Sequence, residues 1–345
     1  MDHQKIVLKL GALAISFALF LRLFGSAVGF SRRIFQNPDL LSFAVFLQTG
    51  RLVRYPQPVP PPTLPTAPST ETPTELPTEP EQEVIATEPP QPDKPTFSPS
   101  DLNSLSMIYG CDYRPDLETL LLSPLNWDLY GDEPAVLILH THATESYAPT
   151  DDAAYTPSGD RRTLEEAYNM LSIGDQVADI LEAGGISVLH DRTFHDYPSY
   201  NGSYVSARNA IAGYLQQYPS IRMVLDIHRD AASTDSGAHL TTSATVNGQP
   251  SSQLMVVIGT DSTGNYHPNW QTNLALALKL TAQWERLSPG ITRPIYLRAE
   301  RFNMDMTPGS LLIEVGASGD THAQALEAAK VLAQGILDLS RGASQ

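Results

Sequence analysis

The chain has 345 residues, of which 41% are hydrophobic, and a formal net charge of −16. This length is sufficient for one sizeable folded domain with additional segments. The acidic balance, without a concentrated run of Lys and Arg, excludes a typical nucleic-acid-binding protein. The single cysteine, Cys111, excludes an internal disulfide and a zinc site built from several cysteines.

The N-terminal segment is predicted to be a membrane anchor over residues 1–35. Residues 10–30 are almost entirely apolar, close to the roughly 20 residues that a helix needs to cross a bilayer. Arg22 lies far enough from the centre of this stretch to snorkel. A cleaved signal peptide is the alternative, but the apolar run is long and no clear cleavage site follows it. We therefore expect an uncleaved, single-pass cell-membrane protein whose remaining chain is extracytoplasmic.

Residues 36–100 are predicted to be a juxtamembrane segment followed by a disordered linker rich in Pro, Thr and Glu. Fifteen of the 28 prolines lie in residues 55–100. Proline removes backbone hydrogen-bond donors and favours an extended chain, and neighbouring acidic side chains repel each other. The folded domain is expected to cover residues 101–345.

Short apolar runs alternate with amphipathic segments in this last part of the chain. In chain order we expect a strand at 136–139, a helix at 169–183, a strand at 186–189, a helix at 204–217, a strand at 223–227, a hairpin at Asn247-Gly248 joining 240–246 to 254–258, a helix at 274–287, a strand at 311–313 and a helix at 323–339. This alternation predicts an α/β fold with a mainly parallel sheet and helices on both faces.

Three of the predicted strands run into polar residues: His140, His142 and Glu145 follow the first, His228 follows another, and Glu314 follows the last. In an open α/β sheet, ligands bind at the carboxyl ends of the strands. Two histidines and a carboxylate suit a catalytic zinc ion that keeps its fourth position for water. A further carboxylate can serve as general base.

The spacing suggests roles for these residues. His142 and Glu145 are three residues apart, so that a single helical turn would place both side chains on one side. We predict His142, Glu145 and His228 as zinc ligands and Glu314 as the catalytic base. His140 remains a candidate ligand, supporting residue or substrate contact.

Arg229 and Asp230 directly follow His228. They are candidates for a charge-assisted pair that orients the strand end, or for contacts to a substrate carboxylate. A purely structural ion pair is an equally good interpretation of the two residues.

Three motifs carry a family resemblance: HTHATESY at residues 140–147, LDIHRDA at 225–231 and LIEVG at 312–316. Together they resemble the stage II sporulation protein P family, over roughly residues 101–340. The resemblance implies a relative of the zinc-dependent N-acetylmuramoyl-L-alanine amidases that thins septal peptidoglycan during engulfment. It also implies a lytic transglycosylase and a polytopic membrane protein as partners, beside peptidoglycan and the membrane.

The resemblance also bears on the site. Glu314 matches the catalytic glutamate of the wider amidase family, and His228 matches its later zinc histidine. In those amidases the ligand glutamate lies further downstream, near an asparagine that resembles Asn169, which makes Glu165 a rival to Glu145. The His142-x-x-Glu145 spacing instead resembles the ligand pair of zinc carboxypeptidases, and we choose Glu145 on that ground.

The expected reaction is cleavage of the amide bond between the lactyl group of muramic acid and L-alanine. A second hypothesis is a zinc peptidase that acts on the stem peptide. The enzyme could also combine amidase and endopeptidase activity. A catalytically inactive scaffold that binds the cell wall is the alternative from another class, and the complete set of four candidate residues argues against it.

Overall fold

The structure is a computed structural model that describes residues 95–125, 128–151 and 153–341. By its internal contacts the chain divides into a unit at Met1–Ile85 and a unit at Ala86–Gln345. The described residues all belong to the second unit. The predicted anchor and almost all of the predicted linker lie outside the described residues. Among the residues that are described, no helix combines the length and apolar character that a bilayer span requires.

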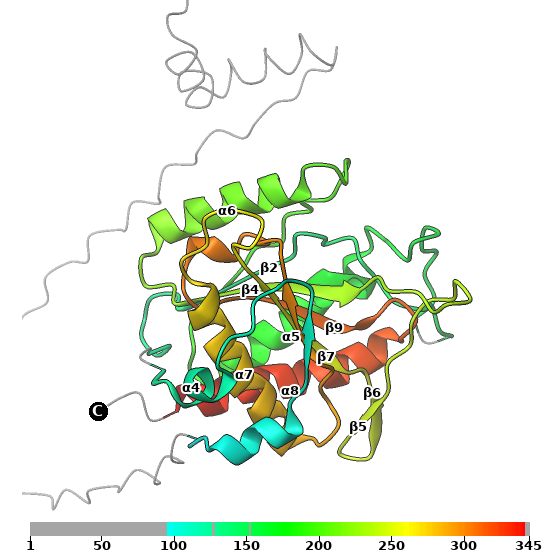
Figure 1. The fold of residues 1–345 in the computed structure, drawn as a ribbon. Coiled ribbons are helices and arrows are strands. Elements are labelled where there is room, and N and C mark those ends of the chain that lie inside the picture. The colour runs from blue at the N-terminus through cyan, green and yellow to red at the C-terminus, as the bar shows by residue number, and fades with distance from the viewer. Residues whose placement is uncertain (1–94, 126–127, 152, 342–345) are drawn as a thin grey trace, which may run out of the picture. The chain divides into compact units, whose positions relative to one another are not determined.

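A seven-stranded sheet forms the centre of the second unit (Figure 1). Its strand order is β1-β8-β7-β9-β4-β2-β3, and only the β7–β9 pair among these neighbours is antiparallel. The strands are β1 (Met107–Tyr109), β2 (Val136–Leu139), β3 (Val188–His190), β4 (Met223–Asp230), β7 (Leu254–Gly259), β8 (Ile295–Arg298) and β9 (Ser310–Ala317). The prediction of a mainly parallel sheet is therefore confirmed.

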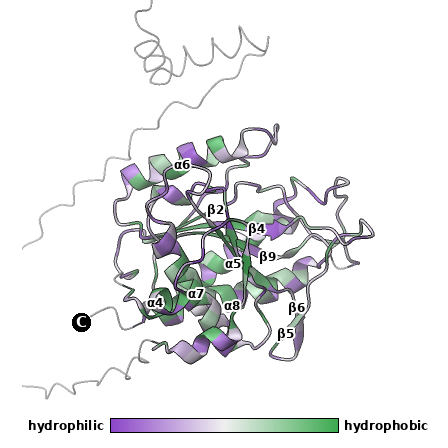
Figure 2. Cartoon of the chain, in the orientation of Figure 1, coloured by the Kyte–Doolittle hydropathy of each residue, from purple (hydrophilic) through white to green (hydrophobic). Residues whose placement is uncertain are grey.

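Helices cover both faces of this sheet, as expected, but unequally. Three long helices, α5 (Met170–Ala183), α7 (Trp270–Leu287) and α8 (His322–Ser340), pack on one face with the short α4 (Leu117–Leu122). The other face is covered by α6 (Ser203–Gln217), which packs on Leu137, Leu139 and Val224. Hydrophobic residues accordingly concentrate on the central strands (Figure 2). Three short 3-10 helices complete the fold: η1 (Pro99–Ser104), η2 (Glu166–Tyr168) and η3 (Met304–Met306).

The central strands are continuous apolar runs because both of their faces are buried. All four residues of β2 and the six residues of β7 are buried. In β2 the alternation sends Ile138 into the larger core under α5 and α8, and Leu137 and Leu139 toward α6.

Two expectations about local structure were wrong. The hairpin at Asn247-Gly248 joins β5 (Ala244–Val246) to β6 (Gln249–Ser251), and β7 pairs with β8 and β9 of the main sheet. Asn247 and Gly248 have φ values of 49° and 79°, as a two-residue hairpin turn of type I′ requires. His142 and Glu145 lie on a turn closed by a hydrogen bond from the Glu145 N–H to the His142 carbonyl, 3.1 Å, and not on a helix.

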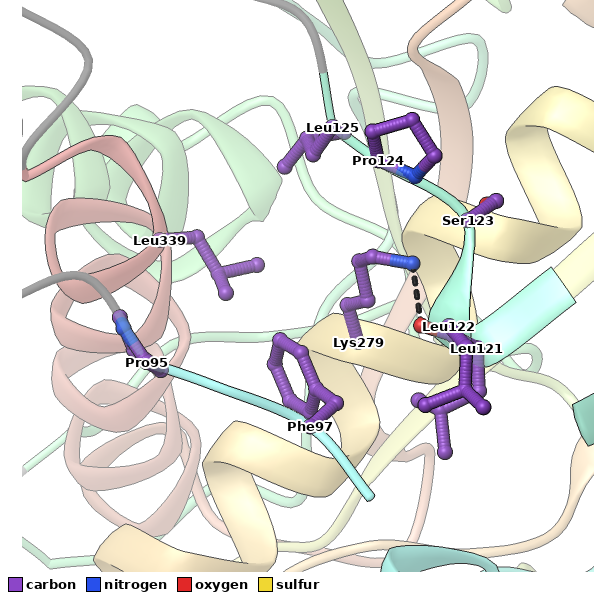
Figure 3. Close-up of a pocket in the computed structure, with 9 residues that line it drawn as sticks. All are labelled: Pro95, Phe97, Leu121, Leu122, Ser123, Pro124, Leu125, Lys279 and Leu339. Atoms are coloured by element: carbon purple, nitrogen blue, oxygen red, sulfur yellow. Dashed lines mark hydrogen bonds between the residues drawn. The ribbon is translucent and has the colours of Figure 1, made fainter. Parts of the chain in front are cut away.

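Residues 95–100, which were assigned to the linker, belong to the folded unit. Phe97 packs against the core, and the Arg286 guanidinium lies 4.9 Å from its ring and donates to the Thr96 carbonyl at 3.0 Å. Phe97 and Pro95 line a cavity of about 170 Å³ together with α4 residues and Leu339 (Figure 3). In its wall the Lys279 ammonium donates to the carbonyls of Leu120 and Leu121, where a cation stabilises the end of helix α4.

Candidate active site

The candidate residues meet at the carboxyl ends of β2, β4 and β9. His142 and Glu145 stand on the turn after β2, whereas His228 and Glu314 lie within β4 and β9. His228 and Glu314 are paired positions of these two adjacent strands, so their side chains point to the same face of the sheet. Val224, two alternations before His228, identifies this as the face that α6 covers.

The structure places three of these side chains in direct proximity. The His142 and His228 rings meet edge to face with centroids 5.2 Å apart. His228 Nδ1 lies 3.5 Å from Glu145 Oε2. All three side chains are buried, so the polar atoms of this cluster face each other and not bulk water.

Asp226 supports both sides of this cluster. Its Oδ1 lies 2.8 Å from His228 Nε2, which leaves Nδ1 as the ring atom that faces Glu145. The same carboxylate accepts hydrogen bonds from the backbone N–H and the hydroxyl of Thr141, at 2.8 and 2.6 Å. Asp226 therefore anchors the turn that carries His142 and lies against the His228 ring, although His228 Nε2 has no hydrogen-bond partner among the described residues.

Cationic groups surround Glu145. The Arg162 guanidinium donates to Glu145 Oε1 at 3.2 Å, and the Arg229 guanidinium lies 3.9 Å from the same oxygen. The backbone N–H of Arg229 also donates to Oε2, at 3.3 Å. Burial acts to raise the pKa of Glu145, but the hydrogen bond from His228 and the charge of Arg229 outweigh it and hold that pKa at about 2. Glu145 is thus a carboxylate at neutral pH, as a metal ligand must be.

Glu314 has the opposite character. Burial, together with the nearby negative charges of Glu145 and Asp230, raises the pKa of Glu314 to about 8. Its Oε2 is buried and has no hydrogen-bond partner among the described residues. A carboxyl group with a raised pKa and an unpaired oxygen is suited to exchange a proton with a substrate or with water.

His142, Glu145 and His228 are of the residue types that zinc prefers, but in this structure they do not lie close enough together to hold a metal ion. Within the described part of the chain no three His, Cys, Asp or Glu side chains are close enough to hold a metal ion. However, His142 Nδ1 is buried without a hydrogen-bond partner among those residues, and burial lowers the pKa of His142 to about 4. A neutral imidazole with a free nitrogen matches the ligands that zinc prefers. Burial acts to lower the pKa of His228, but Asp226 and Glu145 outweigh it and raise that pKa well above its ordinary value, so His228 must lose a proton before it can bind a metal.

His140 directly follows β2 and makes its contacts away from the cluster of His142, Glu145 and His228. It is fully buried, and its Nδ1 lies 2.8 Å from the Ile227 carbonyl while its Nε2 lies 2.9 Å from His190 Nε2. A Cβ at Gly174 would come within 2.5 Å of both rings, so glycine lets α5 close over this histidine pair. In this position His140 contacts β4 and His190, as the candidate role of a supporting residue requires.

Arg229 and Asp230 do not pair with each other, contrary to one interpretation of the sequence. The buried Arg229 guanidinium donates to the carbonyls of Ser146, Asp160 and Arg161. It thereby ties the loop after β2 to β4. Asp230 instead forms an ion pair with Arg293, 2.8 Å.

Glu165, the rival to Glu145, is exposed at the N-terminus of η2. The structure does not bring it to the histidines. Asn169 caps α5 by accepting from the Leu171 N–H at 3.0 Å, which gives this residue a structural role.

Three residues of the site were not singled out from the sequence. These residues are Asp226, Arg162 and Tyr200. The sequence could have indicated Asp226, because a residue two positions before His228 on a strand lies on the same face of the sheet. Arg162 and Tyr200 come from loops distant in sequence, and no sequence pattern indicates that they reach the site. Together with Arg229 they line a cavity of about 420 Å³ beside the cluster, and Arg162 also pairs with the buried Asp196 at 2.8 Å.

Comparison with known proteins gives the following relatives. A curated Stage II sporulation protein P of Bacillus subtilis (strain 168) is 28% identical over 199 residues, which cover 54% of this chain and 46% of that protein. The chain therefore spans about half the length of this relative. Among solved structures, the N-acetylmuramoyl-L-alanine amidase AmiC2 of Nostoc punctiforme is 17% identical, with a TM-score of 0.36 over 60% of this chain and 97% of the other.

The CwlD amidase from Clostridioides difficile, solved in complex with the GerS lipoprotein, is 13% identical, with a TM-score of 0.34 over 59% and 96% of the two chains. These TM-scores are too low to establish a shared fold. The sequence profile of Stage II sporulation protein P, in contrast, matches residues 67–337, which is most of the chain. The chain belongs to the Stage II sporulation protein P family.

Proposed function

We propose that this protein is a zinc-dependent peptidoglycan hydrolase of sporulation that cleaves the N-acetylmuramoyl-L-alanine amide bond. The observation that carries the proposal is the buried cluster of His142, Glu145 and His228 with Glu314 at the paired position of the next strand. Membership of the family supports the assignment to cell-wall hydrolysis during sporulation.

In this proposal His142, Glu145 and His228 hold the zinc ion. When bound, zinc supplies Lewis-acid activation of the scissile carbonyl and of water. Asp226, whose Oδ1 lies 2.8 Å from His228 Nε2, would orient this ring once the metal is bound, as carboxylates behind ligand histidines commonly do. Glu314 accepts the proton of the attacking water and passes it to the leaving amine.

The cavity beside the cluster is the proposed position of the substrate. Arg162 and Tyr200 both line this cavity and contact the cluster, through Glu145 and His142 respectively. A substrate that occupies the cavity would therefore extend directly to the candidate catalytic atoms.

The test is digestion of purified sacculi by the full chain, with product analysis and zinc measurement. We expect close to one zinc ion per chain and free glycan strands separated from their stem peptides. Glu314→Gln is the matched control and should release neither product. Cut cross-links with stem peptides still on the glycan would make the protein an endopeptidase, and inactivity of the zinc-loaded protein would favour a wall-binding scaffold.

The proposed cellular context rests on the apolar run at residues 10–30 for the anchor and on the family resemblance for the protein partners. A single-pass anchor at residues 1–35 would hold an extracytoplasmic enzyme at the cell membrane, next to a lytic transglycosylase and a polytopic membrane protein. Cell fractionation and N-terminal sequencing of the mature protein test this part. A mature N-terminus beyond residue 35 would contradict it.

A further inference from the structure

Tyr200 is the described residue that covers His142 from the outside. Its ring stacks on the imidazole with centroids 4.6 Å apart and an angle of 15° between the planes. Its hydroxyl oxygen lies 3.2 Å from His142 Nε2. Tyr200 comes from the loop between β3 and α6, and 55% of its surface is exposed.

The two nitrogens of His142 have different surroundings. Nε2 faces the Tyr200 hydroxyl, whereas Nδ1 is buried and has no hydrogen-bond partner in the described part of the chain. A neutral imidazole carries one N–H and one lone pair. If the proton sat on Nδ1, a buried donor would be left unsatisfied, which is unfavourable. If it sits on Nε2, it donates to the Tyr200 oxygen, and the buried atom is a free lone pair.

The remaining contacts hold the ring in this orientation. Tyr204 of α6 meets the His142 ring edge to face at 5.5 Å, and His228 does so at 5.2 Å. The Arg162 guanidinium lies 4.9 Å from the Tyr200 ring centroid and also donates to Glu145. Tyr200 is thus linked to two of the three proposed ligands, directly to His142 and through Arg162 to Glu145.

We infer that Tyr200 is a positioning residue that keeps His142 in the Nε2–H form, so that Nδ1 is the atom offered to zinc. This inference rests on the proposed function, because it concerns the same metal site. His228 differs, because its Nε2 lies 2.8 Å from Asp226 Oδ1 but has no hydrogen-bond partner among the described residues, while its Nδ1 lies 3.5 Å from Glu145 Oε2. His142 would then bind zinc through Nδ1, with its Nε2 held by the Tyr200 hydroxyl.

The inference is tested by zinc affinity, measured on the full chain by competition with a chromogenic chelator. Tyr200→Phe keeps the stacked ring and removes only the hydroxyl. We expect it to bind zinc about 10- to 100-fold more weakly than the wild type, the usual effect of losing a partner behind a ligand histidine. Tyr197→Phe is the matched control, because Tyr197 lies on the same loop with the same 55% exposure and should leave the affinity unchanged.

A second measurement reads the ring directly. In ¹⁵N spectra of the metal-free protein, His142 should be in the Nε2–H form in the wild type, and this preference should weaken in Tyr200→Phe. The melting temperature of the metal-free variant should equal that of the wild type, because Tyr200 is largely exposed.

The outcomes separate the two proposals. Unchanged zinc affinity in Tyr200→Phe overturns the inference and leaves the proposed function in place. Tighter zinc binding also overturns it, because the hydroxyl would then compete with the metal for Nε2. A wild type without zinc affinity overturns the proposed function, and the inference with it.

Discussion

Glu314 and Glu145 are two glutamates of one site whose surroundings give them opposite properties. Glu314→Gln keeps the shape of the side chain but cannot accept a proton from water. We expect this variant to retain zinc and to lose activity by about 10²- to 10⁴-fold, the usual effect of removing a general base. Muropeptide release and metal content, measured on the same sample, check this. Loss of zinc together with activity would show that Glu314 holds the metal.

Glu145→Gln should instead weaken zinc binding, because an amide oxygen is a poorer ligand than a carboxylate whose pKa is held at about 2. Added zinc should therefore restore part of the activity, which it should not do for Glu314→Gln. A titration of activity against free zinc measures the effect. Glu165→Gln is the control. Loss of metal from that variant alone would indicate that Glu165 is the third zinc ligand, at the sequence spacing found in the amidases.

The raised pKa of Glu314 predicts how the stability of the metal-free protein depends on pH. Burial raises this pKa to about 8, against about 4.3 for an exposed glutamate. Between these values the folded protein binds more protons than the unfolded chain, so the free energy of unfolding should fall as the pH rises. Chemical unfolding in chelator, with Glu314→Gln for comparison, should show a difference on the order of a few kcal/mol that grows toward pH 8. A difference independent of pH would contradict the assignment.

How much of the site the sequence predicts depends on where its residues come from. His142, Glu145, His228 and Glu314 were predictable because each follows or ends an apolar run, and strand ends of a parallel sheet converge. Arg162 and Tyr200 were not, because they reach the site from loops whose course depends on tertiary contacts such as that between Arg229 and the carbonyls of Asp160 and Arg161.

At the scale of elements, one ion pair connects α6 to the segment before β9. The Arg208 guanidinium binds Asp305 of η3 through two hydrogen bonds of 2.8 and 2.7 Å. Burial acts to raise the pKa of Asp305, but Arg208 outweighs it and the net pKa is lowered. We expect Asp305→Asn to lower the free energy of unfolding by about 1 kcal/mol. The expected loss is small because Arg208 is one-third exposed, so that solvent screens part of its attraction to Asp305.

Thermal melts at pH 7 and at pH 3 check this prediction. Since the folded pKa is depressed, the contribution of Asp305 exists above the ordinary aspartate pKa of about 3.9 and is lost as the pH falls through the folded value. The difference between wild type and variant should therefore shrink at pH 3. Glu166→Gln, which removes the exposed pair with Arg192, is the control and should change the melting temperature little at either pH.

The four long helices were predicted well, as were the short, wholly apolar strand β2 and most of β3, but the short strands β1 and β8 were not. Helices α5, α6, α7 and α8 carry at least 14 residues each, enough turns for the helical period to emerge. Strands β1 and β8, with three and four residues, offer too few positions for an alternating pattern. The role of β6 was missed because Gln249–Ser251 is polar, and its pairing follows from the Asn247-Gly248 turn and not from hydrophobicity.

For the whole molecule, the contacts of Phe97 and Asp101 show that residues 95–104 belong to the folded unit. A chain that lacks residues 55–94 should keep the melting temperature of the full chain. A chain that lacks residues 55–104 also loses the contact of Phe97 with the core and the ion pair between Arg286 and Asp101, 2.7 Å. We expect the larger deletion to melt several degrees lower, measured by circular dichroism. Equal melting temperatures would place these residues in the linker after all.

The single antiparallel pair of the sheet has a consequence for engineering the protein. Since β7 is antiparallel to β9 and β8 is parallel to β7, the loops that follow β7 and β8 lie at the opposite end of the strands from the candidate catalytic residues. The loop at residues 261–266 is largely exposed there, with Gly264 at a φ of 84°. It is therefore a suitable place to graft an epitope or a fluorescent reporter, which would show where the protein lies in the cell while the candidate site at the other end of the sheet stays free.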